Sequence, residues 1–210
     1  MNVDWDAIEA YAEAHSTLPA ELFERLGAET QETQDVPQMM VGALEGAFLS
    51  FAVGMKRPHR VLEIGTFTGW SSIAMASALP PGATLITCDV NEETSAVARR
   101  YAEEAGVADR IEYRLGPAAE TLAALDGPFD LVFIDADKGG YVDYYEAVLP
   151  KLADDGVILV DNTLSDGDVL EPTGPISEAI ARFNDHVHAD DRVECVLLTI
   201  RDGITLIRKR

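Results

Sequence analysis

The stretch VLEIGTFTGWSS, residues 61–72, decides the fold of this chain. A short apolar run ends at Gly65, a second glycine follows at Gly69, and Ser71 opens a segment with helical periodicity. In doubly wound α/β sheets, ligands bind beside such a loop, outside the carboxyl ends of the strands. The loop reads G-T-F-T-G and lacks the close glycine pair of the G-x-G-x-x-G fingerprint, which argues against a nicotinamide-dependent dehydrogenase.

Strands and helices alternate on both sides of this stretch, with helical segments of about ten to fifteen residues between apolar strands. The strands are expected at residues 60–65, 84–90, 111–115, 129–136, 156–161, 193–200 and 203–208. This alternation predicts an α/β fold whose parallel sheet is covered by helices on both faces. The tight turn Asp202-Gly203 joins the last two strands, so one antiparallel strand is expected near the end of the sheet.

The first 55 residues contain only helical patterns. A helix is expected over residues 38–55, with Leu44, Phe48, Phe51 and Ala52 on one face. No repeat or long linker separates this part from the rest. We therefore expect a single domain over residues 1–210, with an N-terminal helical part at 1–55 and an α/β core at 56–210.

Acidic residues dominate the charged residues of the chain. Asp and Glu total 37 against 16 Lys and Arg, which gives a formal net charge of -21. Such a charge argues against binding to a nucleic-acid backbone at low salt, and it suits a halophilic protein whose carboxylates are screened by salt.

No apolar run reaches the roughly 18 residues that a membrane-spanning helix needs. The acidic N-terminus lacks the basic start and apolar core of a signal peptide. A cytoplasmic protein without a membrane partner is therefore expected. Cys88 and Cys195 both fall in expected strands, which predicts buried free thiols rather than a disulfide or a metal pair.

Two carboxylates lie near the ends of the first two strands. Asp89 ends the second strand, at the spacing where a carboxylate can accept hydrogen bonds from both hydroxyls of a ribose. Glu63 lies just inside the first strand, where a carboxylate suits an amino group or a sulfonium better than a pyrophosphate. Together these residues predict a nucleoside-containing ligand that carries positive charge.

Further oxygen ligands follow the fourth and fifth strands. Asp135 ends one strand, and Asp161 and Asn162 end the other. Adjacent parallel strands lie about 5 Å apart, so these side chains are expected to converge. Two carboxylates and an amide oxygen suit a hard divalent cation such as Mg²⁺. The alternative is that Asp161 and Asn162 only cap a loop. The four histidines do not offer a competing site, because no two share a helical face.

Several segments together resemble the cation-dependent class I O-methyltransferases, which include the caffeoyl-CoA O-methyltransferases and are related to catechol O-methyltransferase. The matching segments run in order from about Met39 to the C-terminus: LEIGTFTGWS, CDV, GPA, FIDADKGGYVDYY, GVILVDNTL and DGITLIRK. The resemblance implies S-adenosyl-L-methionine (SAM) as methyl donor. It also implies a Rossmann-like, seven-stranded, mostly parallel sheet with the last strand antiparallel, and a homodimer.

The resemblance also implies which residues form the site. The donor-binding residues would be Val41, Glu63, Gly65, Thr66, Ser71, Asp89, Ala118 and Asp135. The metal ligands would be Asp135, Asp161 and Asn162. Lys138 would be the catalytic base, with Asp135 beside it in the catalytic set; the alternative for Lys138 is a salt bridge to Asp135 or Asp137. The tyrosines that follow, Tyr141, Tyr144 and Tyr145, are expected to pack.

Two departures from the plant enzymes bear on the acceptor. Their Trp-Asn pair after DNTL is replaced here by Ser165-Asp166, and their N-terminal substrate lysine has no counterpart, since the first lysine is Lys56. We therefore expect a small phenolic, catechol-like acceptor rather than an anionic CoA ester. The second hypothesis is methylation of a hydroxylated tRNA base, which the acidic composition disfavours. A donor-binding protein without catalysis is disfavoured because the catalytic and metal-ligand positions are all present.

Overall fold

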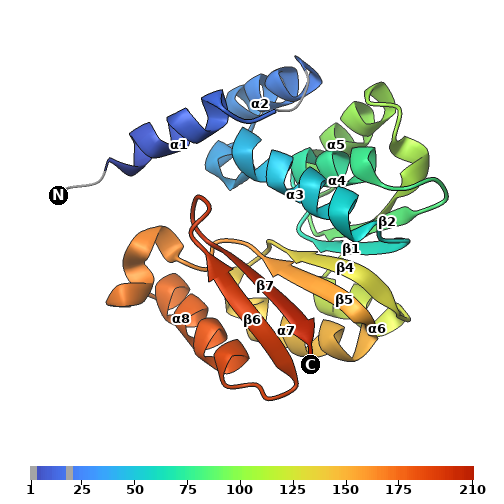
Figure 1. Ribbon diagram of the computed structural model, residues 1–210. Helices are drawn as coiled ribbons and strands as arrows, with labels where there is room; N and C mark the ends of the chain where they lie inside the picture. Colours follow the sequence, from blue (N-terminus) through green and yellow to red (C-terminus); the bar gives the residue numbers. More distant parts are fainter. Residues whose placement is uncertain (1–3, 18–20) are drawn as a thin grey trace.

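The computed structural model describes residues 4–17 and 21–210 and shows one twisted sheet between two layers of helices (Figure 1). The strands are β1 Arg60–Ile64, β2 Thr84–Asp89, β3 Ile111–Leu115, β4 Phe129–Ile134, β5 Leu152–Val160, β6 Val193–Leu198 and β7 Ile204–Lys209. The helices are α1 Trp5–Ala14, α2 Glu21–Thr33, α3 Ala43–Lys56, α4 Trp70–Ala78, α5 Glu92–Glu104, α6 Ala118–Ala124, α7 Tyr141–Val148 and α8 Pro175–His188. Short 3₁₀ turns include η1 Pro37–Met39, η3 Lys138–Gly140 and η5 Ser165–Leu170.

The sheet has seven strands in the order β3-β2-β1-β4-β5-β7-β6. β7 pairs antiparallel with both β5 and β6, and the other neighbours pair in parallel. This confirms the predicted fold and its single antiparallel strand. The predicted two-residue turn is wrong, because residues 199–203 form a longer loop between β6 and β7 in which Arg201 and Gly203 both have positive φ.

Alternate strand residues bury their side chains on opposite faces of the sheet. Val61 and Leu131 belong to the core under α3, α4 and α5, whereas Leu62 and Val132 belong to the core under α6, α7 and α8. All four are at most 1% exposed. Because each such side chain contributes roughly 1.5–3 kcal/mol when buried, the register of the sheet is strongly specified.

α3 differs from its prediction in its start and in its buried face. It begins at Ala43, because residues 40–42 form an extended connection after η1. Its buried residues are Glu45, Gly46, Leu49 and Val53, and Phe51 is 69% exposed. The buried face of α3 is therefore rotated relative to the predicted face. The prediction placed Glu45 on the exposed side of the helix because glutamate is a charged residue.

By length and composition alone, the segment Pro37–Lys56 could cross a membrane, although no apolar run of that length was expected from the sequence. The structure divides it into η1 and the 14-residue α3. A helix of that length measures about 21 Å, less than the roughly 30 Å hydrocarbon core of a bilayer. α3 packs on α4 and contributes Leu49 and Val53 to the core.

The edges of the molecule are more exposed than the sequence predicted. Cys88 is buried as expected, but Cys195 is exposed because β6 is the edge strand of the sheet.

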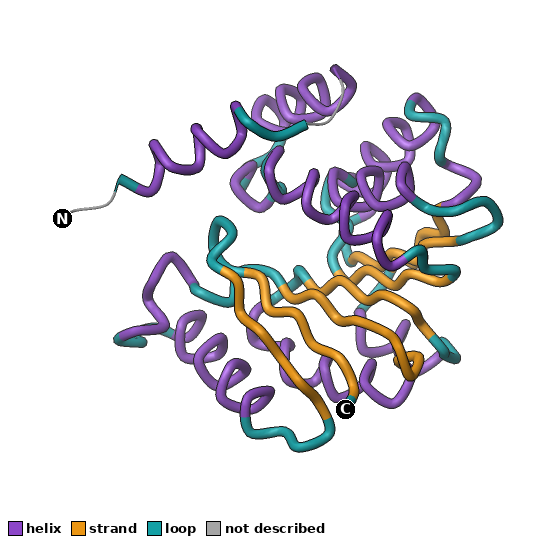
Figure 2. The backbone as a smooth tube through the Cα atoms, in the orientation of Figure 1, coloured by secondary structure: helices purple, strands orange, loops and turns teal. Residues whose placement is uncertain are grey.

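Figure 2 shows α1 extending beyond the rest of the body at the N-terminal side. Its apolar residues Trp5, Ile8 and Tyr11 are 64%, 47% and 67% exposed.

Candidate active site

A cavity of ≈ 850 Å³ lies at the carboxyl ends of the central parallel strands, where the strand order reverses. One end, the loop end, surrounds the loop between β1 and α4. It is lined by Val41, Gly65, Thr66, Ser71, Asp89 and Ala118. The other, the charged end, is lined by Glu45, Lys138, Asp161, Asn162, Asp166, Arg201 and Asp202. Asp135 joins the two, since its backbone lies against Gly65 and its carboxylate contacts Lys138.

Gly65 is required by the approach of the chain to itself. Its φ is +103°, and a Cβ there would lie 1.8 Å from the backbone oxygen of Asp135. Its missing side chain lets the ends of β1 and β4 meet, which brings the loop end and Asp135 into one cavity.

The Asp89 carboxylate holds the loop after β1 in place. Its Oδ2 accepts hydrogen bonds from the backbone N–H groups of Thr66 at 3.0 Å and Phe67 at 2.8 Å, and its Oδ1 accepts one from Asn91 at 2.9 Å. A carboxylate has about four lone-pair sites, so one remains on Oδ1. Asp89 therefore shapes the cavity wall and keeps capacity for a ligand hydroxyl.

Glu63 lies behind the cavity wall and is fully buried. It accepts a hydrogen bond from Ser72, at the start of α4, and its Oε1 has no hydrogen-bond partner among the described residues. Burial raises its pKa to about 7, although the neighbouring hydroxyl groups of Ser71, Ser72 and Thr87 oppose the shift. Of the expected site residues, only Glu63 does not line the cavity.

Lys138 lies at the centre of the charged end. Its Nζ donates hydrogen bonds to Oδ1 of Asp135 at 2.9 Å and to Oδ1 of Asn162 at 2.6 Å. A third bond, 2.7 Å long, goes to the hydroxyl of Tyr141. The ammonium group thus sits on two of the three oxygen donors expected to bind a metal. This arrangement shows that these oxygens converge on a position that accepts a cation.

Asp161 and Glu45 form a buried pair of carboxyl groups next to Lys138. They are 3% and 1% exposed. Burial, followed by the charges of Glu45 and Asp135, raises the pKa of Asp161 well above its usual range. Burial and the charge of Asp135 raise the pKa of Glu45 to about 7. The two groups can hydrogen-bond to each other only while one of them holds a proton, because ionised carboxylates only accept.

Arg201 connects this pair to the N-terminal helices. From the loop between β6 and β7, its Nη1 lies 3.1 Å from Oε2 of Glu45, and its Nε lies 3.3 Å from Oε1 of Glu9 in α1. Sequence reasoning missed both Glu45 and Arg201. One feature of the sequence pointed to burial of Glu45: it precedes Leu49 by four residues and Val53 by eight, so all three lie on one stripe of α3.

Two residues around Lys138 gain roles that the sequence left open. Asp137 does not bond to Lys138; it accepts hydrogen bonds from the backbone N–H of Gly140, at 3.1 Å, and from the hydroxyl of Tyr144. It therefore fixes the turn that carries Lys138. Tyr141 is fully buried, as a packing residue would be, but its hydroxyl also donates to the backbone oxygen of Asp161 at 3.0 Å.

The charged end fits a hard divalent cation by its chemistry. It offers carboxylate oxygens from Asp135 and Asp161 and an amide oxygen from Asn162, which are the oxygen ligands that such a cation prefers. Asn162 adopts φ 56°, and its N–H donates to Oδ1 of Asp161 at 2.6 Å. Within residues 4–17 and 21–210, no three His, Cys, Asp or Glu side chains gather as metal ligands, so the amide is part of the expected set.

Comparison with known proteins identifies similar chains over nearly the whole length. The model of the O-methyltransferase family matches residues 13–210. Caffeoyl-CoA O-methyltransferase 1 of Zea mays is 38% identical over 185 residues, which cover 81% of this chain and 72% of the maize protein.

Solved structures share the fold closely. An SAH-bound methyltransferase of Podospora anserina has a TM-score of 0.92 at 28% identity, covering 100% of this chain and 98% of the other. The O-methyltransferase TomG of Streptomyces achromogenes, involved in tomaymycin synthesis and solved in complex with SAM, has a TM-score of 0.88 at 30% identity, covering 97% and 96% of the two chains.

Proposed function

Because the chain belongs to the O-methyltransferase family, we propose that it methylates a catechol-like small molecule with the help of a divalent cation such as Mg²⁺. Its activity as a SAM-dependent O-methyltransferase follows from the family and from neighbours solved with SAM or SAH. The finer proposal rests on one observation: the amino group of Lys138 is hydrogen-bonded to both Asp135 and Asn162. This supports a cation position with a candidate base directly beside it.

The chain's own residues have three tasks in this reaction. A bound divalent cation supplies Lewis acidity, lowering the pKa of an oxygen ligand and fixing its direction. Asp135, Asp161 and Asn162 would hold it, and two vicinal hydroxyls suit the same site. Lys138 would accept the phenolic proton at Nζ as general base. The ammonium form of Lys138 and the cation use the same oxygens, so loading the site frees Nζ from Asp135 and Asn162.

The donor is proposed to bind at the loop end. Asp89 retains one lone-pair site for a ribose hydroxyl, and Ala118 borders the same part of the cavity. Val41 and Ser71 are buried and line the wall on the side of α3 and α4. The small cross-section of these side chains leaves room for a sulfonium donor next to Asp135, whose carboxylate complements the positive charge.

The charge at the charged end of the cavity, where the acceptor is proposed to bind, supports a small catechol rather than a CoA ester. Its cationic side chains are Lys138 and Arg201, and both are already paired with carboxylates. Asp166 and Asp202 add further negative charge at the rim of the cavity. Phosphates of a CoA ester would find few free positive groups there, whereas a neutral or cationic catechol would not be repelled.

A methyl-transfer screen tests this proposal. The substrates are catechols, hydroxycinnamates, flavonoids, caffeoyl-CoA and tRNA, each with Mg²⁺ or with EDTA, at low and at molar salt. We expect turnover of free catechols that requires Mg²⁺. Full activity in EDTA would overturn the cation dependence, and selective methylation of tRNA or of caffeoyl-CoA would overturn the acceptor class.

The variant Asp161→Ala separates the cation site from the donor site. A metal contributes several kcal/mol of transition-state stabilisation, and each 1.36 kcal/mol is tenfold in rate, so we expect turnover to fall by about 10³-fold. SAH binding, measured by calorimetry, should be retained. Unchanged turnover in this variant contradicts the proposal.

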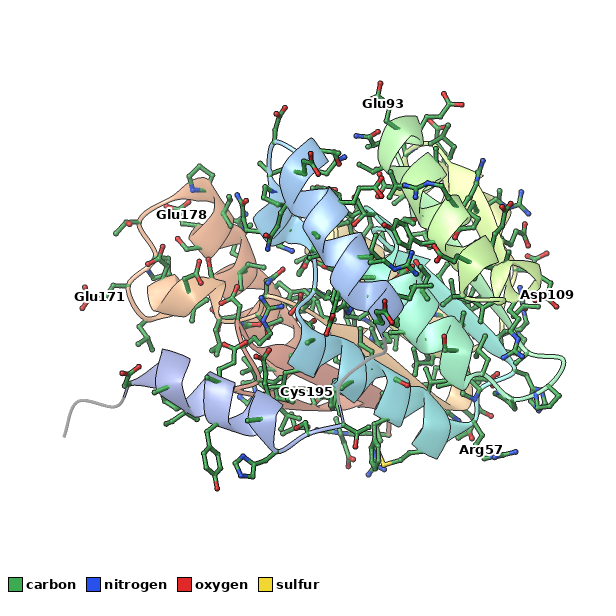
Figure 3. All side chains as sticks on the ribbon, turned by 90° about the horizontal axis from the view of Figure 1, so that it is seen from above. Arg57, Glu93, Asp109, Glu171, Glu178 and Cys195 are labelled. Atoms are coloured by element: carbon green, nitrogen blue, oxygen red, sulfur yellow. The ribbon has the colours of Figure 1, made fainter. Side chains whose placement is uncertain are left out.

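We also propose that the enzyme works as a homodimer in the cytoplasm of a halophilic cell. Exposed apolar side chains on α1 support a partner surface. Figure 3 shows Glu93, Asp109 and Glu171 at the periphery of the molecule, directed outward, in line with the formal charge of -21. Light scattering at low and molar KCl tests both points. A monomer at every salt concentration contradicts the dimer, and unfolding in molar KCl contradicts the adaptation to salt.

A further inference from the structure

We propose that Glu45 is an outer carboxylate of the cation site, which acts through the water bound to the cation, is supplied by the N-terminal part of the chain and is held in place by Arg201. This inference rests on the proposed cation dependence. Glu45 comes from α3, whereas the expected ligands follow β4 and β5. It is 1% exposed, and it lines the same cavity as Asp161 and Asn162.

One oxygen of Glu45 has no hydrogen-bond donor. Among the described residues, Oε1 of Glu45 is buried without a partner, whereas Oε2 receives Nη1 of Arg201 at 3.1 Å. A buried carboxylate oxygen without a donor is strongly unfavourable in a folded protein. The carboxyl group of Asp161 lies within hydrogen-bond reach of Glu45 but can donate to it only while it holds a proton, and Asp135 adds a further negative charge. When all three groups are ionised, a cation with its water shell supplies the partner that this oxygen lacks.

The position of Glu45 is fixed from behind. The guanidinium of Arg201 bridges Glu45 and Glu9, and it also packs against Gly42, where a Cβ would lie 3.0 Å from Cζ of Arg201. These contacts hold Oε2 of Glu45 at the wall of the cavity. The ion pair with Arg201 explains Oε2 and leaves Oε1 to a proton shared with Asp161 or to a cation, and Mg²⁺ binding distinguishes the two.

The first test measures Mg²⁺ binding by calorimetry in the full chain without acceptor. The parent is compared with Glu45→Gln, which keeps the shape of the side chain and removes its charge. Groups that support a metal site typically change its affinity by about 10–100-fold, and we expect a loss in that range. The matched control is Glu194→Gln, which breaks an exposed ion pair with Arg208 away from the cavity and should leave the Mg²⁺ affinity unchanged. SAH binding confirms that each variant is folded.

The second test measures thermal unfolding with and without Mg²⁺. Without Mg²⁺, Glu45→Gln removes a like charge beside Asp161, so it should melt at the same temperature as the parent or higher. Mg²⁺ stabilises the folded chain in proportion to its affinity, so the upward shift it causes should shrink in the variant. A merely structural ion pair predicts the reverse, with a lower melting temperature in both buffers and an unchanged Mg²⁺ shift.

The outcomes separate this inference from the proposed function. A parent chain that does not bind Mg²⁺ overturns the cation dependence, and this inference with it. A parent and a Glu45→Gln variant that bind Mg²⁺ equally overturn only the role of Glu45. If Glu45→Gln does not fold, Glu45→Asp takes its place, because it keeps the charge opposite Arg201 but withdraws the oxygen. Weaker Mg²⁺ binding by the aspartate supports the proposal, and equal binding refutes it.

Discussion

The two ends of the cavity are built in different ways. The loop end is built on one continuous segment, residues 61–72, and on Asp89, whose carboxylate accepts hydrogen bonds from backbone N–H groups of that segment. Val41 and Ala118 complete its wall. The charged end is assembled from side chains of distant segments; Glu45 and Arg201, for example, lie 156 residues apart. The loop end is thus a rigid, local structure, and the charged end depends on the whole tertiary fold. Changes at the two ends should therefore affect donor and cation binding separately.

The largest catalytic effect is expected from Lys138→Met. General-base catalysis contributes typically 10²–10⁴-fold, so turnover should fall by roughly that factor. SAH and Mg²⁺ binding should persist, because the variant removes a cation and no ligand oxygen. The matched control is Lys56→Met, since Lys56 pairs only with Asp155 on the surface, and it should keep normal turnover. A Lys138→Met enzyme as active as the parent would show that another group accepts the proton.

Glu63→Gln should change the pH dependence of stability. The folded chain keeps a proton on Glu63 up to a pKa of about 7, while the ordinary value is 4.5. Between these values the unfolded chain loses its proton first, so the free energy of unfolding of the parent falls as pH rises. A shift of this size corresponds to at most roughly 3 kcal/mol. The variant should therefore be more stable than the parent at pH 8. At pH 5 the difference in the free energy of unfolding should be much smaller. Denaturant unfolding at both pH values checks this, and an equal difference at both contradicts it.

Asp89→Asn should weaken the loop end alone. The asparagine has one acceptor oxygen, which cannot serve Thr66, Phe67 and a ribose hydroxyl together. Hydrogen bonds to charged groups contribute about 1.5–3 kcal/mol, so the dissociation constant of SAH should rise by about 10–100-fold. Calorimetry with Mg²⁺ should show an unchanged cation affinity. An equal loss of Mg²⁺ binding would mean that the two ends are not independent.

The smallest effect is expected from Tyr141→Phe. The hydroxyl accepts a hydrogen bond from Lys138 at 2.7 Å and donates one to the Asp161 backbone. One hydrogen bond contributes about 1 kcal/mol, so turnover should fall by roughly 5-fold while the KM values stay constant. The control is Tyr145→Phe, whose hydroxyl donates to Asp190 away from the cavity. If both variants lose the same turnover, Tyr141 has only a packing role.

The contrast between the two ends also explains what the sequence could predict. The loop end, the alternation of strands and helices and the convergence of Asp135 with Asn162 follow from local patterns and from the geometry of parallel sheets. Glu45 could not be found in this way, because hydrophobic periodicity treats a buried glutamate as a solvent-facing residue. Arg201 could not be found because its reach depends on the length of the loop between β6 and β7, which the sequence suggested to be shorter.

Other differences have equally physical causes. Cys195 is exposed because a strand at the edge of a sheet has a neighbour on one side only, and the sequence of β6 does not reveal its place in the sheet. The predicted helix over residues 38–55 begins only at Ala43, because an extended connection follows η1. In both cases the strand or helix was recognised, and its neighbours or its start were not.

The antiparallel direction of β7 has a practical consequence for attaching this enzyme to a tag, a surface or another protein. Lys209 pairs with Val193, the first residue of β6, and Arg208 pairs with Val157, which is aligned with Leu131 in the first half of β4. The chain therefore leaves the sheet at the end of the strands opposite the cavity (Figure 1). A polypeptide joined after Arg210 would start on that far side. It could be long and bulky without covering the entrance, whereas an insertion in the loop at residues 199–203 would disturb Arg201 and the carboxylates it holds.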